Sequence, residues 1–179
     1  FTIDFIVKKA TLCVSIPILL WSCEKDPIDS DPLLSFPPVQ IAHISSIVQF
    51  GEDLGAGKES PAFEYILLEP FQPVLAVEEG TVKAVVKNAG FNDYEVRVQL
   101  NSSWMIIYDH LVNPAVSKGD NVLPGQLLGA IGDGNRFELQ INNKDGRSYC
   151  PFGYASQSFV DAHKNFTENW CIKETVVNN

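Results

Sequence analysis

Three side chains able to do chemistry lie in two segments with strand-like sequence. His110 falls within the run Trp104 to Leu111, and Arg136 and Glu138 fall within the run Arg136 to Ile141. An imidazole can bind a metal ion or transfer a proton near neutral pH, whereas a guanidinium stays protonated and has no lone pair to offer a cation. Side chains two apart on a strand share a face, so Arg136 and Glu138 could form an ion pair. The simpler alternative is a solvated Arg beside an ordinary surface Glu.

Other catalytic arrangements have little support in the sequence. The remaining histidines are His43 and His163, and a relocated metal site built from His110, Glu138 and one of them stays open. A lone histidine of this kind is more often packed or at the surface than a ligand. No G-x-S-x-G nucleophile elbow occurs, and Gly132 to Asn135 is too short for a phosphate loop and predicts a tight turn.

The composition predicts one globular domain with appendages. The chain has 179 residues, 45% hydrophobic and 20% charged, which is enough for one core but small for two. Its formal net charge is -9, and the 13 Lys and Arg residues are scattered. Nucleic-acid binding needs clustered basic residues, so a nucleic-acid partner is not expected.

The N-terminal segment resembles an export signal. Lys8 and Lys9 precede the mostly apolar run Ala10 to Trp21, which is followed by Ser22 and Cys23. A spanning helix needs ~20 apolar residues, so a cleaved signal fits better than a membrane span or a buried helix. The pattern is similar to a bacterial lipobox and predicts a lipoprotein signal peptide at 1–22, lipidation of Cys23 and a tether at 23–38. The expected location is the bacterial cell envelope, outside the cytoplasm, with membrane contact only through that lipid.

The two remaining downstream cysteines predict a disulfide. If Cys13 leaves with the signal and Cys23 carries lipid, Cys150 and Cys171 form an even pair. In an oxidising compartment they would close a loop of ~20 residues and stabilise the fold by roughly 3 kcal/mol. Two separately buried thiols are the alternative.

The body of the chain, residues 39–172, predicts an all-β domain followed by a flexible tail at 173–179. Short segments rich in apolar residues are separated by Gly, Asn and Asp, as in a sandwich or barrel. After Cys150 the spacing of Phe159 and His163 predicts one short helix at about 157–168, with Ser156 or Ser158 as its N-cap. The expected strands are Ile44 to Phe50, Glu64 to Leu68, Pro73 to Val77, Gly80 to Lys87, Tyr94 to Leu100, Trp104 to Asp109, Gln126 to Ile131 and Arg136 to Ile141.

Several motifs in order resemble the lysostaphin-like zinc peptidases of family M23. The "F-G" that commonly opens this family's domain resembles Phe50-Gly51, and Phe137-Glu138-Leu139 stands where the family has F-E-L after H-x-H. The resemblance implies an M23-type β-sandwich, or barrel-sandwich hybrid, with two sheets enclosing a groove. The other matching segments are Pro73 to Ala76, Glu79 to Val82, Trp104 to Leu111 and Val116 to Gly129.

The ligands that this family uses for zinc are not found at the matching positions. The family takes them from H-x-x-x-D and the second His of H-x-H, leaving a fourth position for water. Here H-x-x-x-D falls on Phe63 to Leu67 or one residue earlier from Ala62, and H-x-H falls on Gly134 and Arg136. The resemblance therefore implies neither a metal nor another cofactor, and no catalytic residue beyond a vestigial His110.

The expected function is binding or regulation without catalysis, connected with peptidoglycan or an envelope protein. Residues expected to line the groove are Tyr65, Tyr108, His110, Arg136 and Glu138, since ligand clefts combine aromatic walls with a few polar groups. Two alternatives remain: an active zinc metallopeptidase with substituted ligands, and a purely structural envelope lipoprotein.

Overall fold

The computed structural model describes residues 30–177. The predicted signal peptide and the lipidation of Cys23 lie outside these residues, as does the first part of the predicted tether. Among the described residues, no helix is long and apolar enough to span a membrane.

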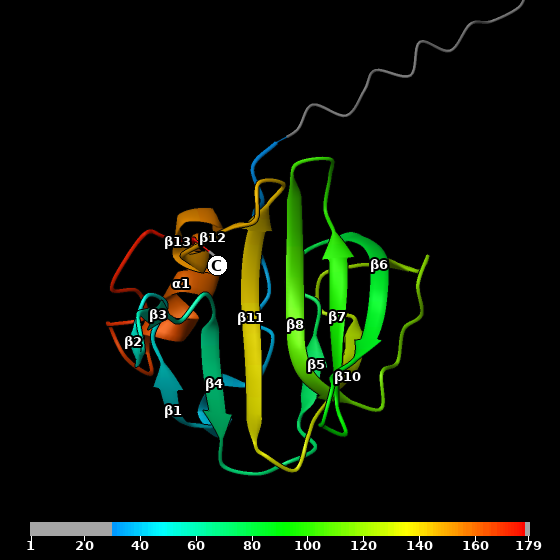
Figure 1. Cartoon of the computed structure of the whole chain (residues 1–179), viewed down its shortest axis with the longest axis horizontal. Helices are drawn as coiled ribbons and strands as arrows, with labels where there is room; N and C mark the ends of the chain where they lie inside the picture. Colours follow the sequence, from blue (N-terminus) through cyan, green and yellow to red (C-terminus); the bar gives the residue numbers. More distant parts are fainter. Residues whose placement is uncertain (1–29, 178–179) are drawn as a thin grey trace, which may run out of the picture.

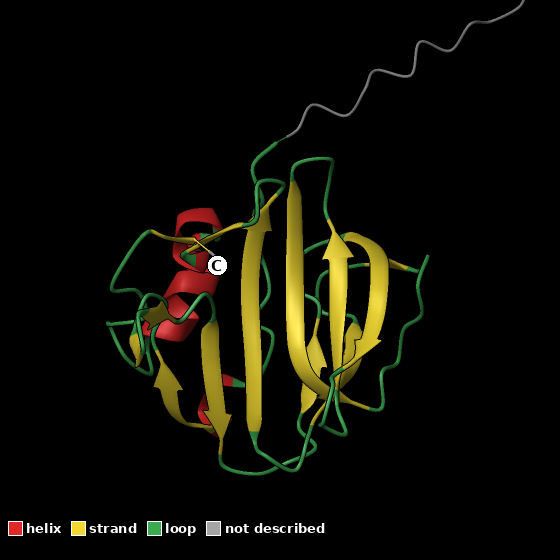
Figure 2. Cartoon of the chain, viewed as in Figure 1, coloured by secondary structure: helices red, strands yellow, loops and turns green. Residues whose placement is uncertain are grey.

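Strands are the main secondary structure of the described domain, which confirms the predicted all-β fold (Figures 1 and 2). Eleven of the strands within residues 30–177 are joined by antiparallel hydrogen bonding, and their main order is β1-β4-β11-β8-β7-β6-β9. These seven are β1 (Ile44–Val48), β4 (Phe63–Leu67), β11 (Arg136–Asn143), β8 (Trp104–Val112), β7 (Tyr94–Gln99), β6 (Gly80–Lys87) and β9 (Asn121–Val122).

The second layer is connected to the first, so the two expected sheets are layers of one continuous hydrogen-bonded sheet. Strand β10 (Leu127–Ile131) pairs with β5 (Pro73–Leu75) and also with the end of β8, where Ile131 lies opposite Leu111. Strand β8 thus continues the hydrogen bonding from one layer into the other. In Figure 1, β5 and β10 lie behind β8 and β7.

Alternation along β11 separates the core from an open polar face. Phe137, Leu139 and Ile141 are fully buried, because they point toward the second layer. Glu138 and Gln140 are only partly buried and point the other way, as the period of two in a strand requires. The same alternation occurs in β8, so β11 and β8 together provide a polar floor for a site.

The C-terminal part packs against the core side of β4. Helix α1 (Gln157–Lys164) begins after Ser156, whose side chain accepts a hydrogen bond from the backbone N–H of Phe159, which confirms one of the two predicted caps. The helix ends earlier than expected, and the carbonyl of His163 accepts a hydrogen bond from the indole N–H of Trp170 at 3.0 Å. The predicted disulfide between Cys150 and Cys171 is confirmed, with Cα atoms 6.1 Å apart.

Both ends of the described region pack more closely than the sequence predicts. Leu34, in the predicted tether, is fully buried, and its N–H donates to the carbonyl of Tyr154 at 2.7 Å. In the predicted flexible tail, β13 (Thr175–Val177) pairs with β12 (Arg147–Tyr149), which extends the sheet beyond β11. Strands β2 (Asp53–Gly55) and β3 (Lys58–Glu59) form a separate hairpin.

Candidate functional site

Three carboxylate residues lie side by side across the floor formed by β4, β11 and β8. Glu138 is directly opposite Glu64 on one side and Asp109 on the other. Directly opposite residues on neighbouring strands have Cβ atoms about 5 Å apart. Three like charges at this spacing repel each other, so the row requires a cation.

Arg136 provides that cation. Its Nε lies 2.8 Å from Oε1 of Glu64 and its Nη2 lies 3.1 Å from Oε2, so the guanidinium contacts both oxygens of one carboxylate. It also forms an ion pair with Glu138, which confirms the predicted pairing over the solvated alternative. Two-pronged contacts of this kind are stronger and more specific than a single hydrogen bond.

His110 lies at the other side of Glu138 and is held between two carboxylates. Its Nδ1 is 2.9 Å from Oδ2 of Asp93, and its Nε2 is 3.6 Å from Oε1 of Glu138. The proximity of Glu138 and the hydrogen bond with Asp93 raise the pKa of His110 to about 9, although burial acts in the opposite direction. The imidazole is therefore positively charged at neutral pH.

The backbone at His110 is strained in a way that fixes the imidazole. His110 has φ +66°, a left-handed conformation that is uncommon for residues other than glycine. Its N–H donates to the side chain of Asp109 at 2.7 Å. The amide of Asn88 donates to both Asp93 and Asp109, at 2.8 and 2.7 Å. Strained residues of this kind occur most often at functional sites.

Electrostatics in the row follow from these contacts. Burial raises the pKa of Glu64, and Arg136 only partly opposes this. Burial also disfavours the charged form of Glu138, but the contact with His110 and the charge of Arg136 lower its pKa overall. Glu138 is thus the carboxylate that both cations share.

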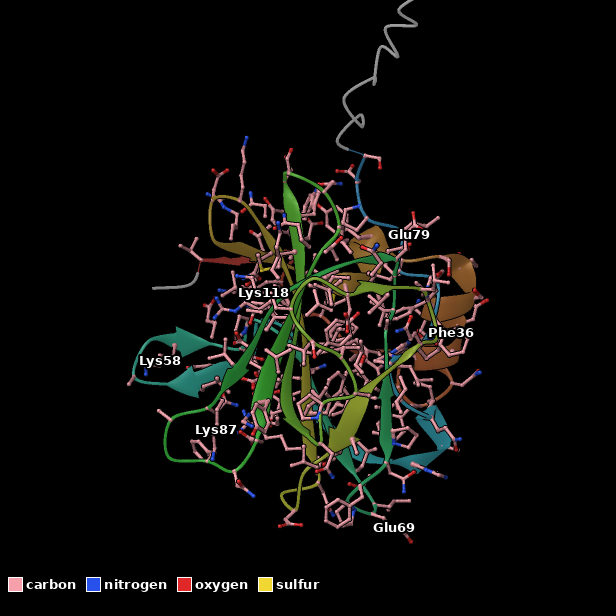
Figure 3. The ribbon with its side chains drawn as sticks, turned by 90° about the vertical axis from the view of Figure 1, so that its right-hand side faces the viewer. Phe36, Lys58, Glu69, Glu79, Lys87 and Lys118 are labelled. Atoms are coloured by element: carbon pink, nitrogen blue, oxygen red, sulfur yellow. A yellow bond between two sulfur atoms is a disulfide. The ribbon has the colours of Figure 1, made fainter. Side chains whose placement is uncertain are left out.

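A cavity of about 310 Å³ opens beside His110 and Arg136. Phe91, whose side chain is 63% exposed, forms its rim. No side chain occupies the space above Gly134, where an added Cβ would meet no atom within 4 Å. In Figure 3 the hairpin that carries Lys58 and the end of β6 at Lys87 project to the same side of the molecule.

Two residues predicted to line the groove belong to the core instead. Tyr65 and Tyr108 are fully buried. Tyr65 follows Glu64 and Tyr108 precedes Asp109, so each tyrosine points to the face opposite the floor. The hydroxyl of Tyr65 bonds to His163 at 3.0 Å, and the hydroxyl of Tyr108 accepts the N–H of Val77 at 3.0 Å. The remaining three predicted residues, His110, Arg136 and Glu138, do come together.

Three members of the cluster were not predicted from the sequence: Glu64, Asp93 and Asp109. Glu64 is a polar residue between the apolar Phe63 and Tyr65 in a predicted strand, and that alternation was a usable signal. Asp93 lies in the loop between β6 and β7. The direction of a loop side chain cannot be predicted from sequence periodicity. The structure does not bring His43 to His110; its Nδ1 bonds to Gln72 at 2.8 Å.

The fold resembles that of several solved structures. Lysostaphin from Staphylococcus simulans aligns with a TM-score of 0.57 and 16% identity, over 74% of this chain and 56% of that chain. Csd3 from Helicobacter pylori aligns with a TM-score of 0.56 and 22% identity, over 71% of this chain but only 36% of that chain. A chain of the SpoIIQ–SpoIIIAH pore-forming complex aligns with a TM-score of 0.56 and 20% identity, over 71% of this chain and 92% of that chain.

Residues 66–146 match the profile of peptidase family M23. This part of the chain is thus similar to peptidase family M23 in sequence. The matched residues include His110, Arg136 and Glu138, whereas Glu64 lies just before them. No match is found among curated proteins.

The zinc ion implied by the M23 family does not fit the residues present. In the motif match from the sequence, Arg136 falls at the second histidine of H-x-H, and its guanidinium contacts Glu64 and Glu138. Gly134 provides no side chain at the other position of H-x-H. Because guanidinium is a cation without a free lone pair, it excludes a metal ion by charge and offers no ligand in exchange.

Proposed function

We propose that this chain is a non-catalytic M23 domain of the bacterial cell envelope, which uses the former peptidase groove to bind peptidoglycan. The observation that carries the proposal is the guanidinium of Arg136 held between Glu64 and Glu138. A fixed organic cation would then take the place of the metal ion that the family uses, above the same floor. A groove whose residues do not fit a metal ion favours binding over hydrolysis.

Binding to isolated cell-wall sacculi tests the proposal. We expect the purified protein to sediment with sacculi and Arg136→Ala to sediment less, because Glu64 and Glu138 would repel each other and distort the floor. Lys118→Ala, an exposed cation in the turn before β9, is the matched control and should bind like the native protein. Equal binding by native protein and Arg136→Ala would count against a role for the groove, and no binding by the native protein would favour a protein partner instead.

An active metallopeptidase is the second candidate, and one observation favours it. Asp109, His110 and Glu138 offer ligand atoms that all lie within 4.8 Å of one another. Against this, the guanidinium of Arg136 pairs with Glu138, so a metal ion at this cluster would lie beside a fixed positive charge. About one zinc per chain, together with release of dye from labelled sacculi that is lost in His110→Ala, would establish the enzyme and reject the binding domain.

The envelope location is a separate part of the proposal and rests on the sequence around Cys23. If Cys23 is lipidated, palmitate label should enter the protein in cells and disappear in Cys23→Ser. Label retained in Cys23→Ser would reject lipidation at this residue without affecting the proposed groove.

A further inference from the structure

The segments that build the outer side of the second layer contain no charged residue. They are 70–77, which includes β5, 121–132, which includes β10, and 32–43, part of which runs beside β5. None of the three contains an Asp, Glu, Lys or Arg, although 20% of the whole chain is charged. This side of the molecule therefore differs in kind from the ionic floor of the first layer.

Large apolar side chains of this layer point outward into solvent. Leu127 of β10 lies opposite Leu75 of β5, so the two side chains lie on the same side of the layer. Their neighbours Leu128 and Val74 are fully buried, which means that Leu127 and Leu75 point away from the core. Leu127 is 47% exposed, and Leu123, in the turn before β10, is 63% exposed.

The part of the chain that leads back toward Cys23 is fixed on this same surface. The N–H groups of Ser35 and Phe36 both donate to the carbonyl of Val77, at 2.9 and 3.3 Å. The ring of Phe36 is 43% exposed and lies against Gly125, where an added Cβ would be 3.5 Å from the nearest ring carbon atoms. We call the four outward apolar residues the back face: Phe36, Leu75, Leu123 and Leu127.

Charged groups border the back face or lie on the opposite side of the molecule. In Figure 3, Lys58 and Lys87 project to the left and Phe36 lies at the right, with Glu79 above it and Glu69 below it. Two copies paired through this face would bring these carboxylates together, which disfavours a second copy as the occupant. Hydrocarbon favours apolar side chains and disfavours charges, so the back face is the side best suited to a lipid surface.

We propose that the back face docks on a membrane surface without net charge, with Phe36, Leu123 and Leu127 in contact with lipid. Cys23 is seven residues before Ser30, and a chain of that length spans at most about 25 Å. A lipid at Cys23 keeps the domain within this distance of the membrane, so the local concentration of lipid surface is high. The docked domain turns its groove away from the membrane. The inference rests on the lipidation proposed for Cys23, but not on what the groove binds.

Spin-labelled lipids test this orientation. The lipidated full-length protein is purified from cells and placed in phosphatidylcholine nanodiscs that contain lipids with nitroxide headgroups, and the broadening of its amide signals is measured by NMR. The signals of Phe36, Gly125 and Leu127 should broaden strongly. Gln140 and Asn142, on the floor side of β11, should keep their signals. Equal broadening of the two sides, broadening of the floor alone, or no broadening would overturn the inference.

Replacing the exposed leucines should weaken docking. In Leu123→Ser/Leu127→Ser the ratio of docked to free domain should fall roughly five-fold for each leucine, because about half of each side chain passes from water to lipid on docking. Leu54→Ser, in the hairpin of β2 and β3, changes a similarly exposed leucine and should keep the native broadening. Broadening that is unchanged in the double variant would overturn the inference.

Two further outcomes separate this inference from its alternatives. A dimer that is lost in Leu123→Ser/Leu127→Ser, without broadening by the nitroxide lipids, would assign the back face to a second copy and overturn docking on lipid. Protein from cells that carries no lipid at Cys23 would also overturn the inference, because the reach of the chain would no longer hold the domain at the membrane. Sedimentation with sacculi would still support the proposed groove in both cases.

Discussion

The hydroxyl of Tyr65 donates a hydrogen bond to Nε2 of His163, with 3.0 Å between the two atoms. The other ring nitrogen of His163 lies 2.7 Å from the carbonyl of Phe159 and donates to it. Both nitrogens are thereby used by a neutral imidazole, and this fixes α1 on the core side of β4. Glu64, the neighbour of Tyr65, faces the site on the other side of the same strand.

Acid should weaken the fold through His163. Burial lowers the pKa of His163 to about 4, against about 6.5 in an unfolded chain. Between these pH values the unfolded state binds a proton at His163 that the folded state does not bind. The free energy of unfolding therefore falls as the pH drops from 6.5 to about 4. The limiting loss is about 3 kcal/mol. Urea unfolding at a series of pH values measures it.

The matched control for this prediction is His43→Gln, which should keep the native pH dependence. The double variant Tyr65→Phe/His163→Phe should be less stable than the native protein at pH 7. Between pH 6.5 and 4, however, it should lose much less stability than the native protein does. An unchanged slope in that variant would assign the acid sensitivity to other groups.

Loss of the disulfide should cost about 3 kcal/mol of unfolding free energy, because Cys150 and Cys171 are 21 residues apart and the cross-link restricts the unfolded chain. The double variant Cys150→Ser/Cys171→Ser, compared with native protein in the presence and absence of a reductant, measures this cost. Reductant should destabilise the native protein alone. A stability loss in the variant on adding reductant would point to another cause.

Replacement of Arg136 should destabilise the domain more than replacement of Arg97. Arg136 contacts two carboxylates and Arg97 only one, while their side chains are similarly exposed, at 43% and 45%. We expect Arg136→Ala to lose about 1 kcal/mol and Arg97→Ala less. The difference should shrink at acid pH, where Glu64 becomes protonated. Equal losses in urea unfolding at pH 7 would show that the shared contact contributes nothing.

The imidazole of His110 should titrate at a pH far above the normal range of a histidine. With its pKa raised to about 9, His110 contributes stability below pH 6.5 that is lost as the pH rises through 9. NMR titration of the imidazole signals should give this value in the native protein and a lower one in Asp93→Asn. Asp133→Asn, which changes a carboxylate of the same cavity, should have a much smaller effect. A normal pKa in the native protein would mean that His110 can be neutral and act as a ligand.

The sequence predicted the strands well because the alternation in β7 and β11 is strict and glycines mark the turns. It also placed Arg136 and Glu138 on one face, because spacing alone determines this. The same rule, applied to Tyr108 beside Asp109, would have placed the tyrosine in the core; its aromatic character suggested a groove wall instead. Asp93 and β13 were not predictable, since one depends on a loop conformation and the other on a free strand edge.

The positive charge of Arg136 does not depend on the composition of the surrounding solution, whereas the charge of a zinc centre does. A bound metal ion is in equilibrium with the solution and can be removed by chelators, by competing metals or by acid that protonates its ligands. The guanidinium is covalently part of the chain and keeps its charge at any physiological pH. The charge that organises this groove therefore cannot dissociate, and Arg136 holds Glu64 and Glu138 together as a permanent part of the chain.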